Sequence, residues 1–270
     1  MTASLAARPH PSTLQQWWVL TFRSIAPTLR NGETATAVAA SVIFTAGFYL
    51  PLKDFMGAAT QGIASSYGQY LAPLIALQAI SFASISGAFR AATDSSAGIN
   101  RRFGSMPIAA LTPAAARMSA NMYRCVIGLA IALICGYLIG FRFHRGPLYI
   151  AGFCALVLLA GLALSSLFDL IGTKARNPET TTPLLMVPQL IFGLVSVGVQ
   201  PAEQFPGWIQ PIVRNQPISQ FIYALRALAG DTTAAVASPT WSVMTPTYLW
   251  ILGLFAVAVP MSAVTASRRP

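Results

Sequence analysis

The residues best suited to chemistry gather in one polar segment, 90–107, which separates two long apolar runs. A short helix in this segment, with the acid near its start, would direct a basic pair and an aromatic ring toward a partner protein. An ordinary basic loop beside a membrane is the alternative. The residues concerned are one acid, one amide, a basic pair, an aromatic residue and a proline, namely Asp94, Asn100, Arg101, Arg102, Phe103 and Pro107.

The sequence carries no catalytic motif that would let it act alone. A P-loop needs Gly-Lys followed by Ser or Thr, and neither Lys53 nor Lys174 follows a glycine. The two histidines, His10 and His144, are far apart, and the three cysteines have neither redox nor metal-ligand spacing. We therefore expect a protein that is not an enzyme and that holds no cofactor or metal of its own.

The elements that must position segment 90–107 are apolar. Six stretches of at least 17 residues carry no charged side chain: 34–52, 55–89, 125–141, 146–168, 180–202 and 232–267. A helix needs about 20 mostly apolar residues to cross a bilayer core of roughly 30 Å. Only 9% of all residues are charged, against about 25% in soluble domains. These features predict an all-α, polytopic membrane protein with six transmembrane helices.

The spans define the domain organisation and the orientation. They are predicted at about 34–52, 72–89, 118–141, 147–169, 181–200 and 247–265, within a transmembrane domain over residues 34–267. Residues 1–33 then form a cytoplasmic N-terminal segment, and residues 268–270 form a cytoplasmic tail. With both termini inside, 12 of the 17 Lys and Arg residues are cytoplasmic, as the positive-inside rule requires. The net charge of +10 thus indicates membrane orientation and not nucleic-acid binding.

The charged residues near the spans suggest little buried chemistry. None of the seven acids falls in the middle of a predicted span, so a proton-coupled carrier would lack its usual titratable group. Arg117 and Arg124 lie seven positions apart at the start of span three, so they share a helical face. Snorkelling toward lipid headgroups is the favoured interpretation of both, and a functional pairing is the alternative.

Two regions outside the spans are predicted to be amphipathic helices. Residues 13–29 hold Trp17, Trp18 and Phe22 next to Arg23, which suits an interfacial helix, and a cytoplasmic helix packed on the spans is the alternative. From Pro217 to Ala229, apolar residues recur with helical spacing, and Gly230 follows as a stop signal. Residues 205–213 form a second candidate. We expect these two external helices to dip into the outer leaflet. Capping of the bundle is the alternative, and it does not exclude the first.

Several motifs make the sequence recognisable. An acid, a basic pair and a proline precede span three, and Arg-Asn-Pro-Glu, Pro-Gly-Trp, Asn-x-Pro and Ala-Leu-Arg-Ala-Leu follow in that order. Together they resemble the ABC-2 type permeases of the daunorubicin-resistance family over most of the chain. The resemblance implies an ABC-2 (type V) exporter permease fold with an N-terminal interfacial helix and short external amphipathic helices. It implies structural or gating roles for the motif residues Asn177, Pro178, Glu179, Pro206, Trp208, Pro217 and Arg226.

The resemblance also implies partners and a cargo. Matches at 89–95, 100–103, 140–146 and 214–221 are similar to mycobacterial members of the family, which export complex surface lipids, notably phthiocerol dimycocerosates. The implied assembly lies in the bacterial plasma (inner) membrane. It joins a second six-span permease, as a heterodimer, to two copies of an ABC ATPase that bind ATP and Mg²⁺. Efflux of amphiphilic drugs such as anthracyclines is the alternative, and a lipid scaffold or enzyme without an ATPase is a further one.

The chain departs from the wider family at one point. Many members carry an acidic-basic-Gly cluster where this chain has Asp94-Ser-Ser-Ala-Gly98. Segment 90–107 resembles the coupling segment of these permeases, which contacts the ATPase. Because it carries fewer charges here, we expect coupling to depend more on Arg101, Arg102 and Phe103.

Overall fold

The computed structural model describes residues 12–30, 33–60, 62–106, 108–109, 111–175, 177–233 and 237–267. Every regular element in these ranges is a helix, which confirms the predicted all-α class. The helices are α1 (Thr13–Arg30), α2 (Glu33–Ala59), α3 (Tyr67–Ser96), α4 (Ile99–Gly104), α5 (Thr112–Leu138), α6 (Pro147–Lys174), α7 (Pro178–Leu194), the 3-10 helix η1 (Ala202–Gln204), α8 (Gln210–Asn215), α9 (Pro217–Ala229) and α10 (Trp241–Ser267).

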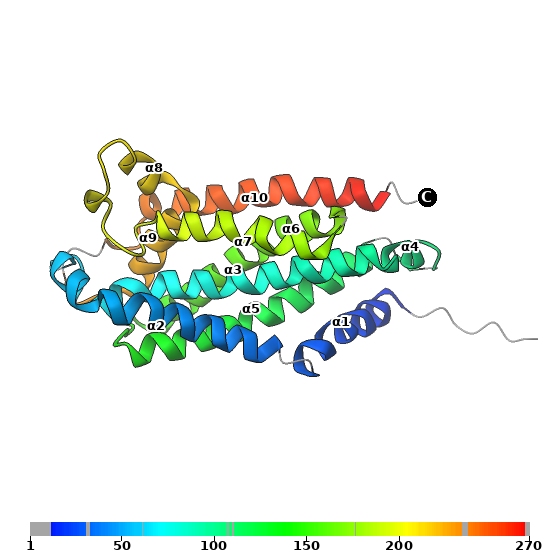
Figure 1. The fold of residues 1–270 in the computed structure, drawn as a ribbon, viewed down its shortest axis with the longest axis horizontal. Coiled ribbons are helices and arrows are strands. Elements are labelled where there is room, and N and C mark those ends of the chain that lie inside the picture. The colour runs from blue at the N-terminus through cyan, green and yellow to red at the C-terminus, as the bar shows by residue number, and fades with distance from the viewer. Residues whose placement is uncertain are drawn as a thin grey trace, which may run out of the picture.

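The long helices form a bundle with two different ends. Helices α2, α3, α5, α6, α7 and α10 run along the long axis, with α1 and α4 at one end and α8 and α9 at the other (Figure 1). Within the described residues, four helices are long and apolar enough to cross a membrane: α3, α5, α6 and the 241–264 part of α10. Helices α2 and α7 overlap the other two predicted spans and contact α3, although α7 ends at Leu194 where the prediction reached residue 200. The count of six spans stays a prediction.

Most of the long helices extend beyond the predicted spans. Helix α3 covers residues 67–96 where the prediction was 72–89, and α2 continues to Ala59. Only residues 60–66 therefore separate α2 from α3. A helix continues wherever its backbone hydrogen bonds can form, whereas the spans were predicted from apolar composition alone. The Ser66 hydroxyl accepts a hydrogen bond from the Gln69 backbone N–H and so caps the start of α3.

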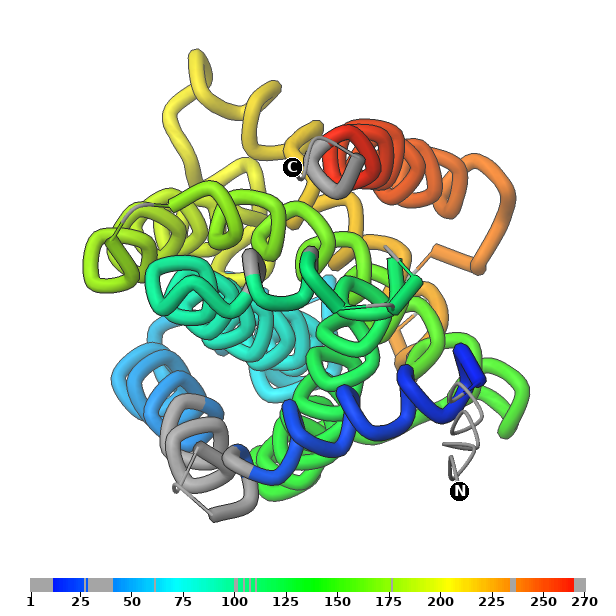
Figure 2. The backbone as a smooth tube through the Cα atoms, turned by 90° about the vertical axis from the view of Figure 1, so that its right-hand side faces the viewer, coloured from blue at the N-terminus to red at the C-terminus, as the bar shows by residue number. Residues whose placement is uncertain are grey.

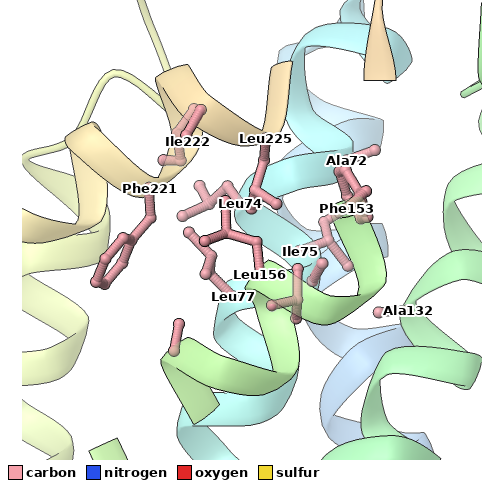
Figure 3. Packing of buried hydrophobic residues seen from close by; sticks show 14 of the residues in the cluster. Ala72, Leu74, Ile75, Leu77, Ala132, Phe153, Leu156, Phe221, Ile222 and Leu225 are labelled. Carbon is pink, nitrogen blue, oxygen red and sulfur yellow. The ribbon is translucent and has the colours of Figure 1, made fainter. Parts of the chain in front are cut away.

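Helix α3 is the centre of the bundle. It is buried along most of its length, and the other helices surround it in the view along the bundle axis (Figure 2). Near one end of the core, Phe221, Ile222 and Leu225 of α9 lie against Leu74 of α3 and Leu156 of α6 (Figure 3). Hydrophobic burial therefore holds α9 against α3 and α6 at this end of the bundle.

The external segment agrees in part with its prediction. Helix α9 spans Pro217–Ala229, and Gly230 follows it with a φ of 71°, a conformation that suits glycine. Its apolar face is buried in the core, so it caps the bundle. The helix predicted over 205–213 was placed too early, because α8 begins only at Gln210. Pro206 is exposed, and the Trp208 side chain is 77% exposed in the turn before α8.

The contact between α3 and α6 depends on a small residue. A Cβ atom added to Gly172 would collide with the backbone carbonyl of Ala88, which cannot move alone. We expect Gly172→Ala to lower the free energy of unfolding by about 1–3 kcal/mol, the usual cost of overpacking. Gly253 of α10 is the matched control, because no atom lies within 4 Å of its added Cβ.

For Gly253→Ala we expect no loss, and a gain of about 0.5–1 kcal/mol from helix propensity. Thermal unfolding of both purified variants in mild detergent would check the pair. Equal effects of the two substitutions would contradict the close approach of α3 and α6.

Candidate functional site

The end of the bundle that carries α1 and α4 contains a cavity of about 330 Å³. It lies between α1, α3, α4 and α5 and brings together Asp94 and Phe103, two residues of the predicted coupling segment. Its charged lining consists of four arginines and one aspartate, namely Arg23, Arg90, Arg117, Arg124 and Asp94. The cavity is therefore polar and strongly basic.

Asp94 does not lie where the sequence predicted it. It belongs to the last turns of α3, half-buried, and not to the start of the short helix. Helix α3 ends at Ser96, Gly98 turns the chain with a φ of 70°, and α4 begins at Ile99. The Ser95 hydroxyl donates to the Thr173 carbonyl at 3.0 Å, which ties this end of α3 to α6. Asp94 thus lines the cavity.

Helix α4 presents its residues unequally. The Arg23 guanidinium lies 5.7 Å from the centre of the Phe103 ring, a cation–π contact that joins α4 to α1. Arg102 is exposed. Asn100 and Arg101 also belong to α4, whereas Pro107 lies outside the described residues.

Helix α1 covers the region of the predicted N-terminal helix and has two different faces. The Trp17 indole N–H donates to the Ser119 hydroxyl of α5 at 3.1 Å, and Figure 2 shows α1 lying across that end of α5. Leu14, Trp18 and Phe22, spaced four apart, are exposed. One face thus packs on a predicted span, as expected of a cytoplasmic helix packed on the spans. The other face is apolar and exposed, as expected of an interfacial helix.

A buried ion pair joins α5 to α6. The Arg117 guanidinium donates to the two carboxylate oxygens of Asp169 at 2.8 and 3.0 Å. The two side chains are only 14% and 7% exposed. This forked geometry is the strong form of an Arg–carboxylate contact. The snorkelling interpretation is therefore wrong for Arg117, and the pairing with Asp169 was missed.

Arg124 is also turned inward. It is buried, and it donates to the Asn121 side-chain oxygen at 2.6 Å and to the Thr28 hydroxyl at 3.1 Å. A third bond reaches the Ser24 carbonyl at 3.2 Å. Arg124 thus fastens α1 onto α5, and snorkelling is wrong for this residue as well.

The Asn-Pro-Glu part of the Arg-Asn-Pro-Glu motif marks the start of α7. The Asn177 side-chain oxygen accepts a hydrogen bond from the Glu179 backbone N–H at 2.9 Å, which is an N-cap. Pro178 occupies the first helical position, where its missing N–H costs nothing. Glu179 is exposed in the first turn, where a negative charge interacts favourably with the helix dipole. These three residues define where α7 begins.

Arg226 links three parts of the opposite end. Its guanidinium donates to the Tyr70 carbonyl at 2.8 Å and to the Val197 carbonyl at 2.9 Å. It also lies 3.5 Å from the centre of the Tyr70 ring. Arg226 therefore fixes α9 to α3 and to the segment after α7. Pro217 starts α9 and has a structural role of its own.

Asp231 links the segment before α3 to the segment after α9. Its carboxylate accepts from the Ser65 backbone N–H at 2.9 Å and from Thr232. Partial burial acts to raise the pKa of Asp231, but the hydrogen bonds from Ser65 and Thr232 outweigh it and lower this pKa. The stability that this carboxylate adds is present at neutral pH and is lost as the pH falls through the lowered pKa.

Comparison with known proteins identifies the family. A model described as "ABC-2 family transporter protein" matches residues 28–264. The chain belongs to the ABC-2 transporter family. This ABC-2 chain is 54% identical to the doxorubicin resistance ABC transporter permease protein DrrB of Mycobacterium tuberculosis, over 96% of its own length and 91% of the relative.

Two further relatives are more distant. The probable doxorubicin resistance permease DrrC of Mycobacterium tuberculosis is 26% identical, over 83% of this chain and 80% of its own. The daunorubicin resistance permease DrrB1 of Streptomyces coeruleorubidus is 28% identical, over 68% of this chain and 65% of its own. The family and the four apolar helices together make the chain a membrane protein.

The ABC-2 chain has a second, apolar cavity of about 210 Å³ between α3, α6, α7, α9 and α10. Pro217 and Ile218 of α9 line it, beside Phe192 of α7. The described residues that line it are all uncharged. At its edge the Gln189 amide donates to the Gln78 side-chain oxygen, which joins α7 to α3. Both glutamines escaped the sequence analysis because they are uncharged and stand within apolar runs.

Proposed function

We propose that this chain is the permease subunit of an ATP-driven ABC exporter. The observation that carries the proposal is the family match over residues 28–264, supported by relatives whose names call them permeases of ABC transporters. The chain itself lacks a P-loop. ATP and Mg²⁺ would therefore bind to partner ATPase subunits, two copies to each complex.

The contacts at the α4 end supply a route for coupling. Phe103 of α4 contacts Arg23 of α1. Arg124 of α5 donates hydrogen bonds to Thr28 and Ser24 of α1. The Arg117–Asp169 pair continues this series of contacts from α5 to α6. An ATPase that moves α4 would thereby displace several helices together.

The proposed topology places six spans in the bacterial plasma membrane with both termini in the cytoplasm. The start of α1, helix α4 and the end of α10 lie toward one end of the bundle (Figure 1). In this orientation the cytoplasmic side receives 12 of the 17 basic residues. The α4 end would then face the ATPase, and the α9 end would face outward.

We expect a second, different permease in the complex. Two relatives, DrrB and DrrC, come from the same organism and both are named as doxorubicin resistance permeases. The chain is 54% identical to the first and 26% identical to the second. This difference favours a heterodimer in which the chain takes the place of the DrrB-like subunit.

The proposed cargo is a complex apolar lipid of the phthiocerol dimycocerosate class. The apolar cavity favours it because its described lining is uncharged, and a charged pocket would waste desolvation energy on such a molecule. Efflux of anthracycline-like drugs is the second candidate, which the names of the relatives favour. Phe168 and Phe192 of the cavity would suit a flat aromatic ring.

A deletion strain separates the two cargoes. Surface lipids would be extracted and quantified, and doxorubicin accumulation would be measured in the same cells, with and without the restored gene. Loss of an exported lipid with unchanged drug accumulation would support lipid export. The reverse result would support drug efflux. No change in either would contradict the proposed function.

The coupling route makes a testable prediction for Phe103→Ala. Loss of the ring removes the cation–π contact with Arg23, and we expect export to fall about two- to fivefold, in line with the usual strength of such contacts. Export would be measured in membrane vesicles that also contain the ATPase and the second permease. Phe103→Trp keeps a ring and should retain activity, and Met106→Ala, at an exposed neighbour, is the matched control. Full export by Phe103→Ala would rule out this route.

A further inference from the structure

We propose that the cavity between α1, α3, α4 and α5 binds a phosphate-bearing anion, either an anionic lipid headgroup or a soluble phosphate compound. The inference does not depend on the cargo, because this site and the apolar cavity have different linings.

The charge of the cavity favours an anion. Four arginines line it against one described acid, Asp94. Asp169 neutralises one of them, because it receives both hydrogen bonds of the Arg117 fork. Among the described residues, three further arginines then line the cavity beside a single acid, and cations held close together repel one another when water is scarce. Guanidinium groups match phosphate oxygens with paired, charge-assisted hydrogen bonds.

A buried amide points to the same ligand. Asn121 is only 2% exposed and lines the cavity. Its side-chain oxygen accepts from Arg124, which fixes the orientation of the amide. Among the described residues, its Nδ2 has no hydrogen-bond acceptor. A buried donor without an acceptor is costly, and a phosphate oxygen in the cavity would supply one.

The position of the cavity suits a membrane-surface ligand. Leu20, Arg23 and Ser24 of α1 line it, while Trp18 and Phe22 on the same helix are exposed. A helix with an apolar exposed face and nearby basic residues lies at headgroup depth. The cavity would therefore open where lipid phosphates are concentrated. Its volume of about 330 Å³ admits a phosphate group together with water.

Binding would be measured on the purified full-length chain with two probes. The lipid arm compares nanodiscs of phosphatidylglycerol with nanodiscs of phosphatidylcholine, whose choline cation the arginines should repel. The soluble arm titrates inorganic phosphate in neutral detergent. Preference for phosphatidylglycerol would assign the site to a headgroup, and saturable phosphate binding alone would assign it to a soluble anion. Absence of binding in both arms would overturn the proposal.

Three variants locate the site. Arg90→Gln should weaken binding about tenfold, the size expected for a lost hydrogen bond to a charged group. Asp94→Asn removes the acid of the cavity lining and should tighten binding severalfold, a gain that misfolding could not produce. Lys174→Gln is the matched control, because Lys174 is exposed near the same end and does not line the cavity. Equal affinities of the first two variants and the wild type would overturn the assignment.

Discussion

Replacing Asp169 with alanine should lower the free energy of unfolding by about 3–5 kcal/mol, the largest effect that we expect in this chain. The substitution leaves the Arg117 guanidinium, whose side chain is only 14% exposed, without its carboxylate partner. A buried charge without a counter-ion is far more costly than a missing pair of charges. Equilibrium unfolding of the purified protein in mild detergent would measure the loss.

A double variant tests the reason for that loss. Arg117→Leu combined with Asp169→Leu removes both charges, so we expect it to recover most of the stability that Asp169→Ala loses. If the double variant were as unstable as the single one, packing and not charge would explain the effect. With the wild type and the double variant, the single variants Arg117→Leu and Asp169→Leu form a complete cycle for the contact energy.

The second large effect is expected at Arg226. Arg226→Ala deprives the Tyr70 and Val197 carbonyls of their donor and removes the contact with the Tyr70 ring. We expect a loss of about 2–4 kcal/mol, because hydrogen bonds to charged groups are the stronger class. Thermal unfolding under the same detergent conditions would report it as a lower Tm.

Two substitutions serve as controls for Arg226. Arg214 also carries an ion pair at this end of the bundle, but its side chain is 50% exposed, so Arg214→Ala should cost less than about 1 kcal/mol. Arg226→Lys keeps the charge without the planar fork and should fall between the two alanine variants. Similar losses for Arg226→Ala and Arg214→Ala would show that Arg226 does not link the helices as described.

Local signals are sufficient to predict part of this structure. Pro217, the apolar repeat and Gly230 lie close together in the sequence, and they define α9 without any tertiary information. Asn177 and Pro178 likewise define the start of α7. What these signals do not contain is the surface that each helix meets. The apolar face of α9 suits a leaflet or a protein core equally well, and here it meets the core.

The pairs in the candidate site depend on which helices are neighbours. Arg117 and Asp169 are 52 positions apart, and each alone is typical of a span boundary. Their pairing follows only when α5 and α6 are known to lie side by side with these ends together. Asp94 illustrates a different limit. The apolar run ends at Phe89, but the helix continues past it, and this carries Asp94 into the cavity.

The central position of α3 has a consequence for biogenesis. Its most apolar window is 89% buried by the rest of the chain, against 17% for that of α10. Most of the helices that cover α3 follow it in the sequence, so the ribosome makes them later. Until α6 and α7 are made, Ser84 and Gln78 of α3 lack the hydrogen-bond partners that these helices supply in the folded chain. Insertion chaperones that shelter polar residues would matter most during that interval.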